Sequence, residues 1–306
     1  MSTVRFGAHM DDDARRQALY DGDVFVYEPT PATQELCGFA RTLIEKAFAP
    51  HDPRLIHQSL GVEQCVAILA ELKPRFIHHP HCKELLAEIL RDFGCDTEKT
   101  YFDVPRLRSA MPNDYLTSGI AYAFHAHRDT WYSAPFCQLN WWLPIYELTE
   151  ENCMAFHPRY WRQPVKNTSR TYNYARWNEE GRKTAAAQIK SDTREQPHAE
   201  EPLELEPSMR LLCPPGGLIL FSGAQLHSTV PNTSGVARYS IDFRTVHQGD
   251  AAARRGAANI DSASTGTTMR DYIRVRDLAH LPESLIEDHD VEGARGYRGP
   301  ATASMV

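Results

Sequence analysis

The hydrophobic pattern changes character about a third of the way along the chain. Three stretches in the first hundred residues place apolar side chains at helical spacing: Thr33 to Phe48, Val62 to Leu72 and Cys82 to Phe93. Prolines stop the first stretch and separate the other two. The first twenty residues form a polar lead-in, and Asp23 to Tyr27 is typical of a short strand. We therefore expect residues 1–100 to be mostly helical and to pack on the rest of the chain.

After about residue 100, short runs rich in aromatic and branched residues are punctuated by Pro, Gly and Asn, which is typical of a β-sandwich or barrel. The predicted strands are Ile120 to His127, Gln138 to Tyr146, Met154 to His157, Met209 to Leu212, Leu218 to Phe221 and Arg238 to Val246. We expect a single domain overall, with its β core at 101–247 and a polar insert at about 159–207 carrying helix and loop over one mouth of the barrel. Residues 248–306 form a C-terminal extension, expected to be partly a lid and partly disordered, above all in its last ten residues.

Composition narrows the classes of function. The 306 residues are enough for a large buried core, and the net charge of −7 argues against nucleic-acid binding as the main task, because a phosphate-binding surface needs a basic excess. The seven cysteines include no Cys-x-x-Cys pair, which argues against a disulfide framework and a structural zinc site. The start lacks the apolar run of a secretory signal, and Pro214 to Gly217 interrupts the longest apolar stretch. We therefore expect a cytoplasmic protein with no membrane contact, whose oligomeric state the sequence does not indicate.

The pattern His127-Arg128-Asp129 is the first candidate for chemistry. Side chains alternate faces along a strand, so His127 and Asp129 are expected on one side, where an imidazole and a carboxylate can share a divalent metal. His227 follows the apolar run Leu218 to Phe221 and could supply a third ligand. Two histidines and one carboxylate on one face leave three coordination positions open, which suits non-haem Fe(II). A short His-x-Asp pair alone also occurs by chance in a chain with 14 histidines.

A candidate anion receptor lies eleven residues after His227. Arg238 begins a predicted core strand, where a guanidinium is costly to bury without an anionic partner. Ser240 lies two residues on and shares its face, and a guanidinium with a hydroxyl makes a good receptor for one carboxylate. A dicarboxylic cosubstrate held at one end by the metal would need such an anchor at its other end.

With these residues in place, the chain resembles the Fe(II)/2-oxoglutarate-dependent oxygenase superfamily, and most of all the phytanoyl-CoA dioxygenase family. The resemblance covers about residues 100–246. It is carried by His127-x-Asp129, Leu148 to Asn152 followed by Phe156-His157-Pro158, Pro215-Gly216-Gly217 with Phe221, His227 with Pro231-Asn232, and Arg238. The resemblance implies a double-stranded β-helix, a jelly-roll-like barrel with flanking helices, hence a mainly β (α+β) fold. It also implies that His127, Asp129 and His227 bind iron and that Arg238 binds the distal carboxylate of 2-oxoglutarate. The Arg-x-Ser arrangement of Ser240 is better known from other branches of the superfamily.

Two features depart from the family pattern. Cys153 stands where the family often has Gly, and His157 to Tyr160 replaces a Pro-Gly-Ser-His turn. That loop frames the substrate pocket in relatives, so the family's substrates are not carried over. We expect a small-molecule metabolite or natural-product intermediate, polar or anionic, with no nucleic-acid or membrane partner.

Further site residues are predicted from alternation. Gln138, Asn140 and Trp142 share one face of a predicted strand, and Asn140 is the candidate for cosubstrate contact. The substrate-facing candidates are His125, Gln138, Trp131, Arg159 and Arg162. The structural alternatives are a hydrogen-bonded core histidine at His125, a rim position for Gln138 and a core position for Trp142. For the basic residues of the polar insert, the alternative is a solvent-exposed face. The run His78 to Cys82 looks metal-like in composition, but a proline kinks it and no partner cluster exists, so we expect no site there.

The resemblance implies oxidative decarboxylation of 2-oxoglutarate with O2, giving succinate, CO2 and most often a hydroxylated C–H. Related halogenases lack the carboxylate ligand, so Asp129 favours hydroxylation, desaturation or cyclisation. Two alternatives stay open: a cupin-like metalloenzyme that does not use 2-oxoglutarate, and a non-catalytic jelly-roll binding protein.

Overall fold

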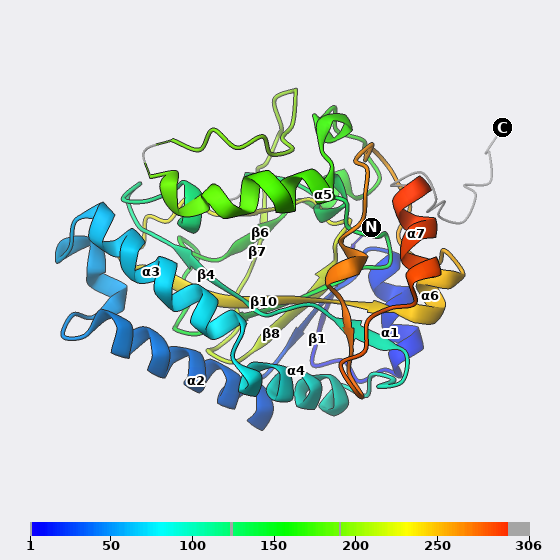
Figure 1. Cartoon of the computed structure of the whole chain (residues 1–306), viewed down its shortest axis with the longest axis horizontal. Coiled ribbons are helices and arrows are strands. Elements are labelled where there is room, and N and C mark those ends of the chain that lie inside the picture. The colour runs from blue at the N-terminus through cyan, green and yellow to red at the C-terminus, as the bar shows by residue number, and fades with distance from the viewer. Residues whose placement is uncertain (1, 123–124, 190, 293–306) are drawn as a thin grey trace.

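The computed structural model describes residues 2–122, 125–189 and 191–292 (Figure 1). Within these residues, a large sheet has the strand order β1-β2-β8-β5-β10-β3-β11, with β4 also paired to β10. Its strands are β1 (Val4–Phe6), β2 (Val24–Tyr27), β3 (Thr100–Phe102), β4 (Arg106–Ala110), β5 (Leu139–Pro144), β8 (Leu218–Ser222), β10 (Arg238–His247) and β11 (Ile273–Arg274). A small sheet has the order β7-β6-β9 and consists of β6 (Met154–Phe156), β7 (Met209–Leu211) and β9 (His227–Thr229). The pairing of β1 with β2 is parallel, and the other named pairings are antiparallel.

Helices flank the large sheet. The α-helices are α1 (Asp12–Tyr20), α2 (Pro31–Phe48), α3 (Val62–Ile77), α4 (Pro80–Asp92), α5 (Tyr174–Arg176), α6 (Gln248–Ala252) and α7 (Glu283–Glu292). Short helical turns are η1 (Pro53–Gln58), η2 (Gly119–Ala121), η3 (Asp129–Tyr132), η4 (Pro158–Trp161), η5 (Ser169–Thr171), the π-type turn η6 (Trp177–Gly181), η7 (Arg182–Ala187) and η8 (Thr268–Asp271). In Figure 1, α2 and α4 lie on one side of the large sheet, whereas β6, β7 and the segment around α5 lie on the other side.

Side chains alternate along β5 and β10 between an apolar core on one face and a cavity on the other. Trp141 of β5 stacks on Phe243 of β10, with ring centroids 5.5 Å apart, in the main apolar core beneath the helices. On the opposite face of the same strands, Asn140, Trp142 and Arg238 line a cavity that Met154 and other residues of the small sheet also line. The two sheets therefore each form part of the cavity wall, and strand period decides which of their side chains reach it.

The helices expected from apolar spacing are present as α2, α3 and α4, with shifted ends. α2 begins two residues before the predicted start because Thr30 caps it and Pro31 occupies its first turn. α3 continues to Ile77, beyond the predicted Leu72, and contains Pro74 in its last turn. The predicted strands at Asp23, Gln138, Met154, Met209, Leu218 and Arg238 correspond to β2, β5, β6, β7, β8 and β10.

The prediction of a polar lead-in at residues 1–20 is wrong, because this segment contains β1 and α1. Asp11 caps α1 by accepting a hydrogen bond from the Ala14 amide at 2.8 Å. The helix buries Arg16, whose Nε lies 2.7 Å from the carboxylate of Asp250. An ion pair that spans most of the chain thus holds a segment with little apolar content.

The strand predicted at Ile120 to His127 is also wrong. Residues 119–121 form the turn η2, Ala123 and Phe124 lie outside the described residues, and His127 makes one isolated β-bridge with His227. The predicted disorder of the last ten residues also lies outside the described residues. Aromatic and branched residues gave this segment the composition of a strand, but among its described residues only His127 pairs with a neighbouring strand.

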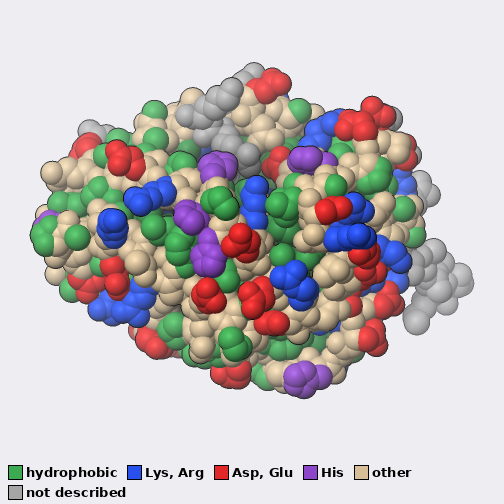
Figure 2. Space-filling view, turned by 60° about the horizontal axis from the view of Figure 1, so that its bottom comes forward, with side chains coloured by type: hydrophobic (Ala, Val, Ile, Leu, Met, Phe, Trp, Pro, Cys, Tyr) green, Lys and Arg blue, Asp and Glu red, His purple; other side chains and the backbone are tan. Residues whose placement is uncertain are grey.

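Basic and acidic side chains are interspersed on the face in Figure 2, and histidines gather near its middle. At the start of α4, His81 lies 3.4 Å from Glu35 and 3.2 Å from Glu84, and its ring lies 6.4 Å from that of His79. Among the described residues, the group of three metal-ligating side chains that converges is elsewhere in the fold. None of the described helices combines the length and apolar character needed to cross a bilayer. All seven cysteines lie in the described residues, and they are buried and form no disulfide there.

Core packing gives a first prediction. Leu220 is fully buried in β8, between β2 and β5, so Leu220→Ala should lower the free energy of unfolding by about 2–5 kcal/mol through lost burial and a residual cavity. Urea unfolding followed by circular dichroism measures this. Leu212→Ala is the matched control, because 47% of Leu212 is exposed, and it should change the stability little. Equal effects at the two positions would contradict this placement of the core.

Candidate metal centre

A reciprocal backbone pairing brings His127 and His227 together across a hundred residues of sequence. The His127 amide donates to the His227 carbonyl at 2.9 Å, and the His227 amide donates back to the His127 carbonyl at 3.0 Å. The two rings lie side by side with centroids 4.4 Å apart. β9 begins at His227, so the bridge fixes the His127 segment against the small sheet.

A backbone carbonyl orients each imidazole. Nδ1 of His127 lies 2.7 Å from the carbonyl oxygen of His125, and Nδ1 of His227 lies 3.0 Å from that of Gln225. A carbonyl only accepts hydrogen bonds, so each Nδ1 carries the proton in the neutral ring. Both Nε2 atoms are then left with lone pairs, as metal-ligating histidines require.

Asp129 completes the set from the first residue of η3. Its amide donates to the Gly223 carbonyl at 2.8 Å, which fixes the turn beside β8. Oδ1 lies 3.4 Å from Nε2 of His127 and 3.9 Å from Nε2 of His227, and one ligand atom from each residue lies within 4.8 Å of the others. Three nitrogen and oxygen donors this close can hold one metal ion.

The second carboxylate oxygen of Asp129 faces away from the histidines. Oδ2 accepts hydrogen bonds from Gln138 Nε2 at 2.9 Å and from Asn140 Nδ2 at 2.8 Å, and Arg244 Nε lies 3.8 Å away. Gln138 is in turn held by Tyr272, whose hydroxyl donates to its Oε1 at 2.8 Å. These partners fix the carboxylate so that Oδ1 stays directed at the imidazoles.

The protonation states suit a metal. Burial alone would raise the pKa of Asp129, but the adjacent imidazole of His127 and the charge of Arg244 hold this pKa well below its usual range. Burial, helped by the adjacent His127, lowers the pKa of His227 to about 4. Asp129 is therefore charged and His227 neutral near pH 7, which are the forms that bind metal.

A buried ion pair holds the residue between the ligands. Arg128 Nε lies 3.0 Å from Asp261, and its two Nη atoms donate to the carbonyls of Ala224 at 2.7 Å and Tyr160 at 2.6 Å. Asp261 also accepts from Trp131 Nε1 at 2.7 Å. The C-terminal extension thus anchors the segment that carries His127 and Asp129.

Arg238 and Ser240 occupy the same face of β10. Arg238 is buried, stacks on Trp142 with its guanidinium carbon 5.4 Å from the ring centroid, and donates from Nη1 to the Asn152 carbonyl at 3.3 Å. Burial lowers the pKa of Arg238 to about 10, so it remains charged at neutral pH. Its Nε and the hydroxyl of Ser240 are buried without a hydrogen-bond partner among the described residues. Such atoms are costly to bury and indicate a ligand that supplies acceptors.

The three candidate ligands and Arg238 line one cavity of about 430 Å³, within the range of small-molecule pockets. Asn140 lines it as well. The insert contributes Tyr172, Tyr174 and other residues to the wall.

Several predicted substrate contacts lie elsewhere. His125 is exposed and only its carbonyl serves the site, whereas Trp131 is fully buried against Asp261. Arg159 is exposed in an ion pair with Glu204, and Arg162 is exposed; neither lines the cavity. Gln138 sits behind Asp129 rather than on the cavity wall. For Arg159 and Arg162, the solvated-face interpretation therefore fits better.

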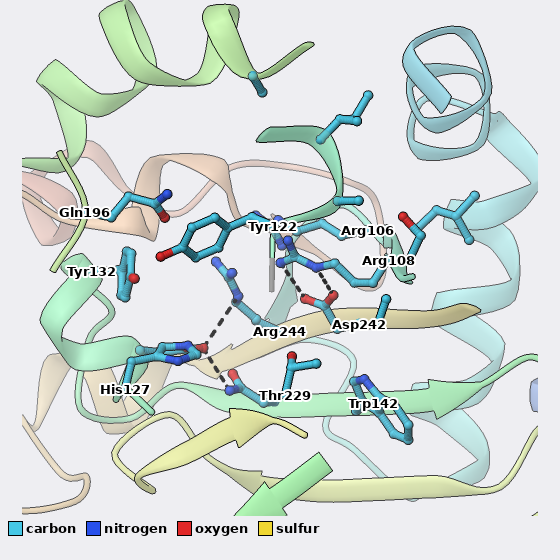
Figure 3. Close-up of a pocket in the computed structure, with 18 of the residues that line it drawn as sticks. Arg106, Arg108, Tyr122, His127, Tyr132, Trp142, Gln196, Thr229, Asp242 and Arg244 are labelled. Carbon is cyan, nitrogen blue, oxygen red and sulfur yellow. Dashed lines mark hydrogen bonds and ion pairs between the residues drawn. The ribbon is translucent and has the colours of Figure 1, made fainter. Parts of the chain in front are cut away.

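Apart from Arg238, the basic residues that reach the cavity were not predicted from the sequence. Arg106 and Arg108 of β4 lie across from Asp242 and Ser240 of β10, and their side chains point into the cavity (Figure 3). The alternation Arg106-Leu107-Arg108 was the available signal, because Leu107 faces the apolar core. Lys73 reaches the cavity from α3.

Comparisons with known proteins give distant structural likenesses. No protein-family model matches the chain, and no curated protein matches it significantly. Similar solved structures include EvdO2 from Micromonospora carbonacea var. aurantiaca complexed with 2-oxoglutarate, at 14% identity, covering 78% of this chain and 91% of that chain, with a TM-score of 0.45. The epimerase SnoN in complex with Fe3+, alpha ketoglutarate and nogalamycin RO has 16% identity, coverage of 77% and 85%, and a TM-score of 0.40. The non-heme monooxygenase ThoJ, in its apo form, has 12% identity, coverage of 88% and 90%, and a TM-score of 0.40. All three TM-scores are below 0.5, so the assignment of function depends on this chain's own side chains.

The support around Asp129 gives a second prediction. Gln138→Leu keeps the volume but removes one of two hydrogen bonds to Oδ2, and it should weaken Mn(II) binding about 10- to 100-fold without abolishing it. Isothermal titration calorimetry on metal-free protein measures the affinity. Gln34→Leu, at an exposed position of α2, is the control and should bind Mn(II) like the parent protein. An unchanged affinity in a folded Gln138→Leu protein would show that Gln138 does not position the ligand.

Proposed function

We propose that this chain is an Fe(II)- and 2-oxoglutarate-dependent oxygenase that oxidises a small molecule. One observation carries the proposal. A convergent His127, Asp129 and His227 set and a buried guanidinium with a partnerless Nε line the same cavity. The first feature fits a metal, and the second fits the far end of an anionic ligand of that metal.

The donor set fits Fe(II). Two imidazole nitrogens and one carboxylate oxygen, all supplied from one side, leave open positions for a bidentate cosubstrate and O2. When bound, the iron supplies the redox chemistry that couples decarboxylation of 2-oxoglutarate to oxidation of the substrate, with succinate and CO2 as products. Asn140 and Gln138 hold Asp129 in position, so we assign Asn140 to the support of the metal ligand at the cavity wall.

The partnerless polar atoms fit 2-oxoglutarate. Arg238 is held by Trp142 and by the Asn152 carbonyl, and its Nε has no hydrogen-bond partner among the described residues. A carboxylate between this Nε and the Ser240 hydroxyl would satisfy both groups with charge-assisted hydrogen bonds. We therefore assign Arg238 and Ser240 to the distal carboxylate of the cosubstrate.

The reaction class follows from the third ligand. Asp129 is present and held by two hydrogen bonds, so the position that a halogenase leaves for chloride is filled. We propose hydroxylation of an unactivated C–H bond, with desaturation or cyclisation as variants of the same chemistry. The two sheets around the cavity support a double-stranded β-helix with its catalytic core at residues 101–247, and the motif resemblance to the phytanoyl-CoA dioxygenase family supports the same assignment.

A third prediction tests the function by thermal unfolding. Mn(II), as an oxygen-stable substitute for Fe(II), should raise the unfolding temperature, and 2-oxoglutarate should raise it further only when the metal is present. At 100 times its dissociation constant, a ligand stabilises the native state by about 2.7 kcal/mol. Arg238→Met should keep the metal shift but weaken 2-oxoglutarate binding about 10- to 100-fold, because it removes a charged hydrogen-bond donor.

Arg75→Met, at an exposed position of α3, is the control and should behave like the parent protein. A metal shift with no 2-oxoglutarate shift would instead support a cupin-like metalloenzyme. No metal shift at all would support the non-catalytic binding protein.

A further inference from the structure

The cavity wall carries more basic side chains than binding of 2-oxoglutarate requires. Among the described residues that line the cavity, six side chains are basic and two are acidic: Lys73, Arg106, Arg108, Arg194, Arg238 and Arg244 against Asp129 and Asp242. Clustered like charges are costly in a partly buried site unless counter-charges are supplied. A basic residue that lacks a carboxylate partner therefore indicates where an anionic ligand would bind.

Four of the basic residues already have carboxylate partners. They are Arg106 with Asp103 at 2.5 Å, Arg108 with Asp242 at 2.5 and 3.2 Å, Arg194 with Asp192 at 2.5 Å, and Arg244 with Asp103 at 3.7 Å and Asp129 at 3.8 Å. Among the described residues, Lys73 and Arg238 have no carboxylate within ion-pairing distance. Arg238 is assigned above to 2-oxoglutarate, so Lys73 is the remaining basic residue of the cavity without an anionic partner among the described residues.

Lys73 is positioned for an anion that the protein does not supply. It projects from α3, which packs against β4, and its Nζ donates to the Ile120 carbonyl at the cavity wall. Burial, together with the nearby charge of Arg108, lowers the pKa of Lys73 to about 7. A carbonyl satisfies one of three ammonium protons and cancels no charge, so an anion beside Lys73 and Arg108 would be stabilised by both.

Arg108 can bind a ligand without isolating its partner. Asp242 lies near Arg106 and Arg244 as well as Arg108, and all three charges lower its pKa against the effect of burial. Sharing Arg108 with a ligand anion would therefore leave Asp242 next to two other cations. Figure 3 shows Arg108 and Asp242 on the far side of the cavity from His127, with Tyr122 and Tyr132 also on its wall.

We propose that the compound oxidised by this protein carries an anionic group, a carboxylate or a phosphate, which Lys73 and Arg108 bind. This inference rests on the proposed function. The dianionic cosubstrate offsets the charge of a divalent metal, so the filled site keeps its surplus positive charge. The anionic group is then held at one side of the cavity, and the rest of the molecule extends past Tyr122 and Tyr132 towards the metal ligands.

The test uses the full chain loaded with Mn(II) and saturating 2-oxoglutarate. Benzoate and phenyl phosphate are the anionic probes, and benzamide is the neutral probe of similar shape. We expect at least one anionic probe to bind ten times more tightly than benzamide by calorimetry, and the better probe identifies carboxylate or phosphate as the preferred group. Lys73→Met should reduce this preference about tenfold while 2-oxoglutarate binding stays unchanged. Arg75→Met removes a cation from the same helix outside the cavity, so it should keep the full preference.

Arg108→Gln is the second variant, with its unfolding temperature measured first because it removes a partner of Asp242. The proposal is wrong if neither anion exceeds benzamide in protein that binds Mn(II) and 2-oxoglutarate. It is also wrong if Lys73→Met weakens 2-oxoglutarate binding as much as Arg238→Met does, because the anion held there is then the cosubstrate. Failure of the proposed function differs from both results, since Mn(II) and 2-oxoglutarate would then produce no thermal shift in the parent protein.

Discussion

The reciprocal pair of hydrogen bonds between the backbones of His127 and His227 is the constraint on which the candidate site depends. It joins a loop to the small sheet at one residue, and it sets two imidazoles side by side although a hundred residues separate them. Asp129 then reaches the same point because its own amide is tied to Gly223, just after β8. Main-chain contacts thus place all three donors, while side-chain contacts only orient them.

The second organising factor is the cost of buried charge. One face of β10 carries Arg238, Ser240, Asp242 and Arg244 in strict alternation, and all of these but Ser240 line the cavity. In an apolar core, such a row of polar and charged groups would be prohibitively costly. Burial of each charged group costs less free energy when a neighbour of opposite charge lies beside it, as Asp242 does beside Arg108. The places where compensation is missing, at Arg238 and Lys73, are therefore the best structural indication of what the protein binds. They are independent of any resemblance to other proteins.

Much of the site could be predicted from sequence because its signals are local. The three ligands, Arg238 and Asn140 each lie in a short motif or on an alternating strand, and the structure brings all five to one cavity. The expected cause of this convergence was nevertheless partly wrong. His127 and Asp129 converge through a bridge and a helical turn, not through alternation along a strand.

Other features could not be predicted because they depend on contacts between distant polar residues. The pairing of Arg16 with Asp250 stabilises a helix that has few apolar residues. Tyr272 and Asp261 lie in a tail of small and polar residues, where no pattern marks them as supports of the metal ligands. The composition of the insert predicted a basic surface facing the substrate, yet Arg159 forms an ion pair with Glu204 at the surface. Composition records that charges are present, and only the fold decides which ones face the cavity.

The contacts of the C-terminal extension have a consequence for biosynthesis. Asp261 clamps Arg128, and Tyr272 holds the amide that steadies Asp129, so both supports come from the last fifth of the chain. A ribosome makes His127 and Asp129 long before it makes these supports. The nascent protein therefore exposes its ligands without the contacts that orient them, and the metal centre matures only when synthesis is nearly complete. Completion of the candidate metal centre is in this sense a late step of folding rather than its nucleus.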